Sequence, residues 1–521
     1  MRRQIMPEYV IGANILENLT TGMYQDSKVI YREYIQNCCD QIDKAIKSNL
    51  LKPGEGKIEI WLEYDKRTIV IEDNATGIPA ASFQATLGNI ADSNKTIGED
   101  KGFRGIGRLC GLAYCRELVF TSSAKGENII SILRCDAKKM RQLIFENERG
   151  RKHTVIDVLN AINDFEEKNT KDIDSHFFKV ELIGINNENT DLLDFKQIKD
   201  YLSFVAPVPY QNSFYYRTEI YDHAKELGIA LDEYSIKLDG EPIFKKYTTI
   251  LKEPGGNKYD DIFGVHFMDF YDDNGELFAW MWIALSKFRK AIPKINQMRG
   301  LRLRKENIQI GGEDSLQKLF KEDRGNGYFV GEVFALSKDL IPNSQRDYFN
   351  ENTARAYFEK ELRRYFNEEL HKIYYDGSAY NSAYKKIDTF EKKEAEFKEK
   401  EASGAFVDGE HRDAEQKAVL DSKKEAVSAQ ARIEKLKDKA DDLMIKVIER
   451  IENERPQKNP TQTIKPVRGL EANGKSPHRT DKLSQYSKNE RKLISRIFGI
   501  IVQSTDSENA EKIITRIEEE L

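Results

Sequence analysis

Three short segments near the N-terminus combine carboxylates, amides and glycines at spacings that could hold a ligand and act on it. The first is Glu33-Tyr-Ile-Gln-Asn37-Cys-Cys-Asp40. On a helix, positions 33, 37 and 40 share one face. An asparagine amide offers a hard oxygen ligand suited to Mg²⁺, and a glutamate can orient or deprotonate a water. Taken alone, the segment also fits an ordinary polar helix face.

The second segment is Ile69-Val-Ile-Glu-Asp73-Asn-Ala-Thr-Gly77. A strand that ends in aspartate and then turns through glycine presents one carboxylate at the edge of a sheet. Such a carboxylate can accept a hydrogen bond from an exocyclic amine, as adenine carries. A strand, an aspartate and a turn are also a common structural combination, so this segment alone decides nothing.

The third segment is Lys101-Gly102-Phe103-Arg104-Gly105-Ile106-Gly107-Arg108, which leads into an apolar helix with Leu109 and Leu112. Glycines let the backbone approach a phosphate, and a helix beginning after them favours an anion. The order is neither that of the dinucleotide-binding loop nor that of a Walker loop.

Alternation of apolar and polar residues predicts the elements that must position these segments. Residues 8–50 have helical spacing, and short strands are predicted at 57–62, 68–72, 118–122, 129–133 and 154–159. Helices packed on such a sheet make an α/β sandwich. Further strands are expected at 179–183, 262–267, 278–285 and 328–336, before a helix at 351–375.

The composition changes after residue 385. Residues 385–454 are rich in Lys, Glu and Ala with apolar residues at three- and four-residue spacings, which predicts one long helix or coiled coil, broken near 403–409. Residues 455–481 contain four prolines and six Lys or Arg against two acids, which is typical of a flexible basic linker. A capping box at Ser487-x-x-Glu490 opens a final helical pair.

Charge and cysteine usage narrow the class of protein. The net charge of -5 argues against a chain-wide surface for nucleic acid or membrane, and no apolar run is long enough to span a bilayer. The five cysteines form no CxxC pair, which favours buried reduced thiols over disulfides or a zinc site. We therefore expect a cytoplasmic protein with no membrane association.

Together and in this order, the three segments resemble the GHKL superfamily (gyrase, heat-shock chaperone, histidine kinase, MutL), whose nucleotide-binding domain has the Bergerat fold. The likeness is strongest to the ninety-kilodalton heat-shock chaperones, through residues 16–40 (LENLTTGMYQDSKVIYREYIQNCCD) and Leu87-Gly-Asn-Ile-Ala-Asp-Ser93. The glycine-rich segment looks more like the MutL phosphate loop. Ala75 departs from the superfamily's Asp-x-Gly-x-Gly turn, and 94–101 leaves room only for a short lid.

The resemblance implies that ATP and Mg²⁺ are cofactors of a slow, Mg-dependent ATPase. Asp73 would accept a hydrogen bond from the adenine amino group. Thr154, which lies in a segment similar to a later strand of the family, would help to hold the adenine. Asn37 would hold Mg²⁺ and Glu33 would activate the attacking water. The other residues expected to contact ATP are Asp40, Gly77, Ser93, Lys95, Gly102, Phe103, Arg104, Gly105, Ile106 and Gly107.

A further match lies far downstream. Asp339-Leu-Ile-Pro-Asn-Ser-Gln-Arg346-Asp is similar to a middle-domain segment of the chaperones whose arginine reaches the γ-phosphate. Arg346 is therefore assigned a catalytic role by resemblance, with Arg299, Arg302 and Arg304 as rivals.

The predicted class is α+β, in five parts. They are a Bergerat-fold α/β sandwich at 1–162, a transducer-like α/β domain at 163–380, a charged helix or coiled coil at 381–454, a basic linker at 455–482 and a helical hairpin at 483–521.

The resemblance also implies a homodimeric conformational switch that acts on an unidentified protein partner, as a chaperone-like ATPase does. Two alternatives stay open. One is a MutL- or microrchidia-like clamp that binds DNA through the basic linker, and the other is a nucleotide-sensing scaffold in a bacterial defence system. We expect neither a histidine kinase nor a topoisomerase, because the phosphoacceptor region and the strand-passage module are not evident in the sequence.

Overall fold

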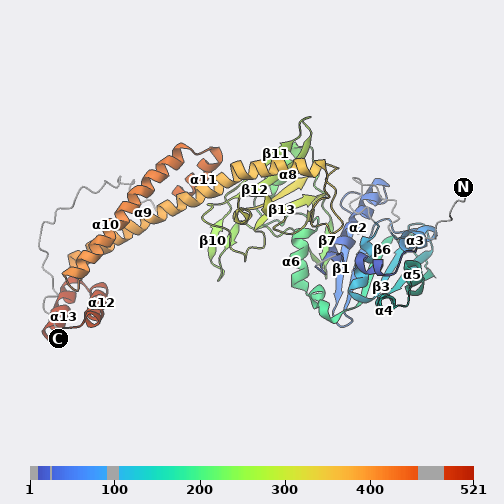
Figure 1. Ribbon diagram of the computed structural model, residues 1–521, viewed down its shortest axis with the longest axis horizontal. Helices are drawn as coiled ribbons and strands as arrows, with labels where there is room; N and C mark the ends of the chain where they lie inside the picture. The colour runs from blue at the N-terminus through green and yellow to red at the C-terminus, as the bar shows by residue number, and fades with distance from the viewer. Residues whose placement is uncertain (1–9, 21, 24–25, 91–104, 456–485, 521) are drawn as a thin grey trace, which may run out of the picture. The chain divides into compact units, whose positions relative to one another are not determined.

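The computed structural model describes residues 10–20, 22–23, 26–90, 105–455 and 486–520 (Figure 1). The chain forms two compact units, one of residues 1–285 with 291–368 and one of residues 286–290 with 369–521. Among the helices of the described part, none is both long and apolar enough to cross a bilayer.

The N-terminal half of the first unit is built on an eight-stranded sheet of order β5-β4-β3-β6-β2-β1-β7-β8. All neighbouring strands are antiparallel except β1 and β7. The strands are β1 (Lys57–Glu63), β2 (Thr68–Asp73), β3 (Cys115–Ser123), β4 (Ile129–Asp136), β5 (Asn163–Asn169), β6 (Phe177–Ile185), β7 (Ser235–Leu238) and β8 (Glu241–Pro242). The mixed α and β architecture predicted from the sequence is confirmed.

The helix α2 (Val29–Lys47) forms the centre of the layer that covers this sheet. Its apolar side chains join those of β1, β2, β3 and β6 in one buried cluster. All five cysteines belong to this cluster, and none of them forms a disulfide. The other helices of this half are α1 (Asn14–Leu19), α3 (Ala80–Gly88), α4 (Ala137–Glu148), α5 (Val155–Ile162), α6 (Phe195–Val205) and α7 (Arg217–Glu226), with 3₁₀ turns η1 (Gly107–Ala113) and η2 (Asn187–Leu193).

Two predictions for this half are wrong. The strand expected at 154–159 is helix α5, because Thr154 and Asp157 form a capping box and Val158 and Ile162 are buried four residues apart. The strand at 179–183, assigned from the sequence to the second region, is β6, which pairs with both β2 and β3. The first sheet therefore continues beyond the boundary expected at residue 162.

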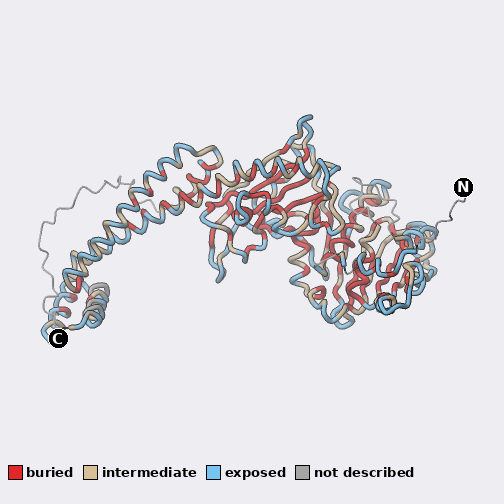
Figure 2. Tube along the Cα trace, viewed as in Figure 1, coloured by how far each residue is buried: buried red, intermediate tan, exposed pale blue. Residues whose placement is uncertain are grey.

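A second sheet, of order β11-β12-β15-β13-β14, follows in the same unit. Its strands are β11 (Gly264–Tyr271), β12 (Leu277–Leu285), β13 (Gly300–Lys305), β14 (Ile308–Ile310) and β15 (Val330–Ala335). A two-stranded sheet of β9 (Ile250–Lys252) and β10 (Lys258–Asp261), the turns η3 (Gln317–Leu319) and η4 (Asp323–Tyr328), and helix α8 (Thr353–Tyr365) complete it. In Figure 2 the strands β12, β13, β14 and β15 are almost wholly buried, whereas β11 is mostly intermediate.

The second unit is helical. After the π-helical turn η5 (Phe366–Leu370) come α9 (His371–Ser403), α10 (Gly409–Asp438), α11 (Asp442–Asn453), α12 (Lys488–Ser504) and α13 (Ser507–Glu520). The break predicted near 403–409 is confirmed, since Gly404 ends α9 at φ +63° and the Asp408 side chain caps α10. Ion pairs Lys400–Glu415 at 2.5 Å and Lys386–Glu425 at 3.4 Å show that α9 and α10 run antiparallel. Coiled-coil packing stays a prediction, and residues 456–485 of the basic linker lie outside the described residues.

A fully buried ionic network holds the second sheet together. Glu332 of β15 pairs with Arg304 of β13 and with Lys245, whose Nζ lies 3.2 Å from Glu332 Oε2, and all three side chains are 0% exposed. Tyr210 and Tyr247 also donate to this carboxylate. Burial lowers the pKa of Lys245 to about 8, while Arg304 and Lys245, against the effect of burial, bring the pKa of Glu332 down to about 2.

We predict that Glu332→Gln lowers the free energy of unfolding by about 3–5 kcal/mol, because two buried cations would lose their shared carboxylate. Urea unfolding followed by tryptophan fluorescence measures this free energy. Trp282 reports on the network because its Nε1 donates to Tyr210 Oη at 3.1 Å. The exposed Glu276→Gln is the matched control. An equal urea midpoint for wild type and Glu332→Gln would contradict the prediction.

Candidate functional site

A cavity of about 680 Å³ in the first unit brings together segments that lie up to 313 residues apart in the sequence, from Glu33 to Arg346. Glu33 and Asn37, one turn apart on α2, line one side of it. The turn after β2 lines a second side and residues 105–108, before η1, a third. Arg346, from the loop that follows β15, completes the lining. Four segments singled out in the sequence thus meet at one cavity.

Glu33 and Arg346 form an ion pair in this cavity. Arg346 Nε lies 3.2 Å from Glu33 Oε1, and the two residues are 9% and 6% exposed. Arg32 approaches the same oxygen with Nη2 at 3.6 Å. Arg346 has a φ of +54°, a left-handed conformation that is uncommon for a residue with a side chain. Such strain is frequent at functional sites and is consistent with a guanidinium held in a set position.

Contacts between α2 and the glycine-rich segment leave no room for larger residues. A Cβ on Gly107 would lie 2.4 Å from Glu33 Oε2, and one on Gly111 would lie 2.4 Å from Tyr34 Oη. Tyr34 donates to the carbonyl of Arg108 at 2.9 Å and accepts from the Gly111 amide at 3.2 Å. The side chain of Arg108 donates back to the carbonyl of Gly105 at 2.8 Å. The backbone at 105–107 is therefore fixed directly against the carboxylate of Glu33.

Asp73 lies one layer behind the lining of the cavity, at the end of β2. It is 1% exposed, and its partner across the sheet is Phe178 of β6, which does line the cavity. Asp73 Oδ1 accepts from the Ala75 amide at 2.9 Å, whereas Oδ2 is buried and accepts no hydrogen bond from the described residues. Burial raises the pKa of Asp73 to about 7, opposed in part by the Ala75 amide and the Cys38 thiol. A buried carboxylate oxygen without a partner is costly and suits a ligand donor.

The turn after Asp73 depends on one glycine. Gly77 has a φ of +64°, and a Cβ there would lie 1.9 Å from the carbonyl oxygen of Ser123. Ser122 anchors the next residue by accepting from the Ile78 amide at 2.7 Å. Ala75, by contrast, does not have a positive φ. The departure from the family's first glycine is therefore sterically neutral, while the second glycine is required.

The structure does not bring every predicted residue to the cavity. Thr154 caps α5, and its hydroxyl donates to Asp157 Oδ2 at 2.7 Å, so it lies outside the lining. Asp40 is 3% exposed and is also not part of the lining. The remaining predicted contacts lie outside the described residues. They are Ser93, Lys95, Gly102, Phe103 and Arg104.

Other lining residues were not singled out from the sequence. Gln41 and Lys44 continue the stripe of Glu33 and Asn37 along α2, so helical spacing could have found them. Phe120 and Phe178 lie on neighbouring strands with their rings 6.0 Å apart, and no short-range pattern pairs them. Among the described lining residues Glu33 is the one carboxylate, against the cations Lys44, Arg108 and Arg346. The cavity therefore favours a polyanion.

The rival arginines face elsewhere. Arg304 is buried in the ionic network with Glu332. Arg299 and Arg302 line a separate cavity described below. Among these four arginines, Arg346 is the one that lines the cavity with Glu33 and Asn37.

Comparison with known proteins agrees with this geometry. The family described as histidine kinase-, DNA gyrase B-, and HSP90-like ATPase matches residues 32–165, which contain Glu33, Asn37, Asp73 and residues 105–107. This match places residues 32–165 in the GHKL superfamily. Chaperone protein HtpG of Bordetella parapertussis is 35% identical over 85 residues, which are 15% of this chain and 13% of the chaperone. The GHKL assignment therefore rests on the N-terminal domain, and the likeness is to the HSP90 branch.

We predict that Asp73→Asn stabilises the nucleotide-free protein at pH 8. The folded pKa of Asp73 is about 7, above the ordinary 3.8, so its contribution to stability is complete below pH 3.8 and is lost as the pH rises through 7. The neutral amide of asparagine does not ionise and so avoids this loss of stability. The free energy of unfolding of Asp73→Asn should exceed that of the wild type by on the order of 2–4 kcal/mol at pH 8, and the difference should shrink towards pH 4.

Thermal unfolding from pH 4 to pH 8 measures this difference. Asp65→Asn, at an exposed turn, is the control for the substitution itself. A wild-type protein more stable than Asp73→Asn at pH 8 would contradict the assignment of a buried, incompletely bonded carboxyl group.

Proposed function

We propose that this protein binds ATP in the cavity beside α2 and hydrolyses it. The observation that carries the proposal is the meeting of Glu33, Asn37, residues 105–107 and Arg346 in one cavity. These are the positions that the resemblance to the heat-shock chaperones assigns to the water, the metal, the phosphates and the γ-phosphate. The excess of cations in the lining supports binding of a triphosphate, and the match to an ATPase family supports the reaction.

We infer that Asp73 selects the base. Oδ2 is the acceptor position that an adenine amino group would complete, with Oδ1 already satisfied by the Ala75 amide. The carboxyl group of Asp73 does not itself line the cavity. To reach it, the base would enter beside Phe178 and Gly77, which do line the cavity, and would displace part of this lining. Removing the required acceptor should cost much more affinity than a lining contact does.

The residues present fit a magnesium ion. Asn37 supplies one amide oxygen at the cavity, and Mg²⁺ commonly takes its other ligands from phosphates and water. When bound, the ion would neutralise charge on the phosphates. Asn37 would hold it, and the backbone N–H groups of Gly105, Ile106 and Gly107 would position the phosphates from the other side.

For hydrolysis, Glu33 is the proposed base. It would orient a water and accept its proton as the water oxygen bonds to the γ-phosphorus and the bond to the β-phosphate oxygen breaks. Arg346, 3.2 Å from Glu33, is positioned to stabilise the charge that develops on the transferred group. While Arg346 and Arg32 both face Glu33, the carboxylate is held by cations, so a γ-phosphate must compete for Arg346 before the base is released.

This competition makes nucleotide state a conformational signal. Arg346 belongs to the region of the second sheet and Glu33 to that of the first, so ATP would change how these two regions contact each other within the first unit. We propose a homodimeric, chaperone-like switch that acts on a protein partner through this change.

We predict that Glu33→Ala binds ATP at least as tightly as the wild type, because Arg346 loses its competing carboxylate, but hydrolyses it about 10²–10⁴-fold more slowly, because the general base is lost. Arg346→Gln should also retain binding within about tenfold and lose most turnover. Phosphate release at saturating ATP, with affinity measured by calorimetry, separates the two properties. Full turnover by Glu33→Ala would refute the assignment of the base, and Glu63→Ala at the exposed end of β1 is the matched control.

A further inference from the structure

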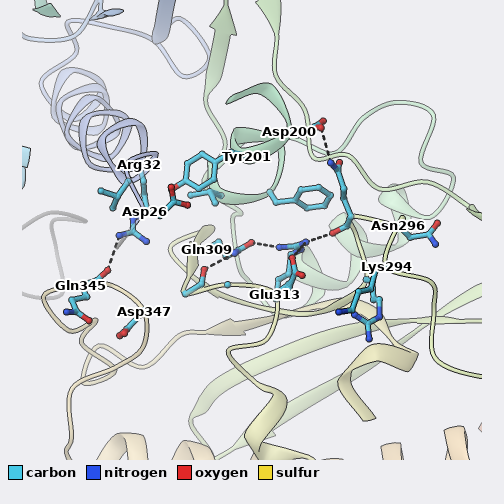
Figure 3. A pocket seen from close by; sticks show the side chains of 18 of the residues that line it. Asp26, Arg32, Asp200, Tyr201, Lys294, Asn296, Gln309, Glu313, Gln345 and Asp347 are labelled. Carbon is cyan, nitrogen blue, oxygen red and sulfur yellow. Dashed lines mark hydrogen bonds and ion pairs between the residues drawn. The ribbon is translucent and has the colours of Figure 1, made fainter. Parts of the chain in front are cut away.

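A second cavity, also of about 680 Å³, lies directly beside the proposed ATP site within the first unit (Figure 3). It is lined by the start of α2, by α6, and by loops next to β13, β14 and β15. Consecutive residues alternate between the two cavities. Arg32 lines the second and Glu33 the first, and Gln345 lines the second while Arg346 lines the first.

Three arginines with incomplete partners surround this second cavity. Arg302 is 4% exposed and lies over the ring of Phe204 at 4.1 Å. It donates to Gln309 Oε1 at 3.0 Å and to the carbonyl of Gln297. Its nearest carboxylate, Glu313, is 3.9 Å away and 65% exposed. Burial lowers the pKa of Arg302. A buried cation this weakly compensated is costly, and an anion would reduce the cost.

Arg32 and Arg299 are similarly placed. Arg32 donates to the carbonyl of Gln345 at 3.1 Å and shares Glu33 with Arg346. Arg299 packs so closely on Gly327 that a Cβ there would lie 2.3 Å from its Nη2. Its Nε is buried and makes no hydrogen bond with the described residues. The Nε atoms of Arg32 and Arg302 share this property.

Beyond these contacts, the neutral and acidic groups of the cavity leave the Nε atoms of the three arginines without an acceptor among the described residues. Asn296 is engaged with the backbone of Lys252, and Gln309 donates to the carbonyl of Gly311 at 2.8 Å. Asp200 pairs with Lys246 at 2.7 Å and accepts from Gln297. Asp26 and Asp347 are exposed at the rim. The formal charges of the lining balance, but the buried charges are cations, so the binding capacity left inside the cavity is for an anion.

We propose that this second cavity binds a phosphate-bearing small molecule through Arg32, Arg299 and Arg302, and that its occupancy adjusts ATP hydrolysis. Guanidinium groups suit phosphate oxygens because they present paired N–H donors. The volume falls in the range of small-molecule sites. An anion that draws Arg32 away from Gln345 and Glu33 would loosen the contact that holds the Arg346 loop. The binding site stands on the cavity itself, whereas the effect on hydrolysis rests on the proposed function.

Calorimetry with inorganic pyrophosphate tests the site on the full chain saturated with a non-hydrolysable ATP analogue. We expect binding that weakens at least about tenfold in Arg299→Gln and is unchanged in Arg116→Gln, an exposed arginine of β3. Citrate, run in parallel, distinguishes phosphate from carboxylate chemistry. Absence of pyrophosphate binding, equal binding by Arg299→Gln, or tighter binding of citrate would each overturn the proposal.

Repeating the titration without the analogue keeps the two proposals distinguishable. If ATP itself fails to bind, Arg299-dependent pyrophosphate binding still supports the second cavity and only the proposed function falls. If ATP binds and is hydrolysed, saturating pyrophosphate at constant free Mg²⁺ should change wild-type turnover at least about threefold and leave Arg299→Gln unaffected. Identical turnover with and without pyrophosphate in the wild type would overturn the coupling.

Discussion

The ion pair between Glu33 and Arg346 is the contact on which the account of this molecule depends. It joins a helix of the first sheet to a loop that follows the second, and its 3.2 Å separation occurs where both side chains are nearly buried. A carboxylate in such surroundings needs its cations, and the arginine is held in a left-handed backbone conformation beside it. Under the proposed function an incoming phosphate would be an alternative partner for Arg346, so ligand binding and the packing of the two regions would become one equilibrium.

The helix α2 contributes residues to both cavities. Because successive residues on a helix point in different directions, Arg32 and Glu33 line different cavities although they are neighbours in the chain. The loop around Arg346 alternates in the same way. A ligand of one cavity would therefore contact residues that are neighbours in the chain of those lining the other. The second sheet supports the loops that line these cavities. Within it, the buried ion pair between Glu332 and Arg304 links β15 to its neighbour β13.

Local patterns predicted much of the fold. Period-two alternation located β1 and β2, short β-rich runs located β3 and β4, and residues 403–409 located the break between α9 and α10. The capping box at Thr154 was overlooked, so a helix was taken for a strand. The extension of the first sheet to β7 was not predictable from local signals, because β1 and β7 pair across about 180 residues.

Some residues of the candidate site could be predicted from local sequence patterns, and others could not. Glu33 and Asn37 share a helical stripe, but the stripe continues through Gln41 and Lys44 and not through Asp40, because the cavity follows the spacing 33, 37, 41, 44. Arg346 was reached only by resemblance, since nothing near it in the sequence indicates a contact with Glu33. In the sequence, Arg299 and Arg302 stand out only as rivals of Arg346, and Arg32 is not singled out. Their placement together at one cavity comes from the fold.

The most direct measurement of the central claim is the affinity of the wild-type protein for ATP and for GTP at pH 8, by calorimetry with Mg²⁺. At that pH Asp73, with a pKa of about 7, is mostly ionised and can only accept hydrogen bonds. Adenine presents an amino group to it, whereas guanine presents a carbonyl oxygen. The account predicts that ATP binds and that GTP binds at least roughly 100-fold more weakly. Equal affinity for the two nucleotides, or no binding of ATP, would contradict it.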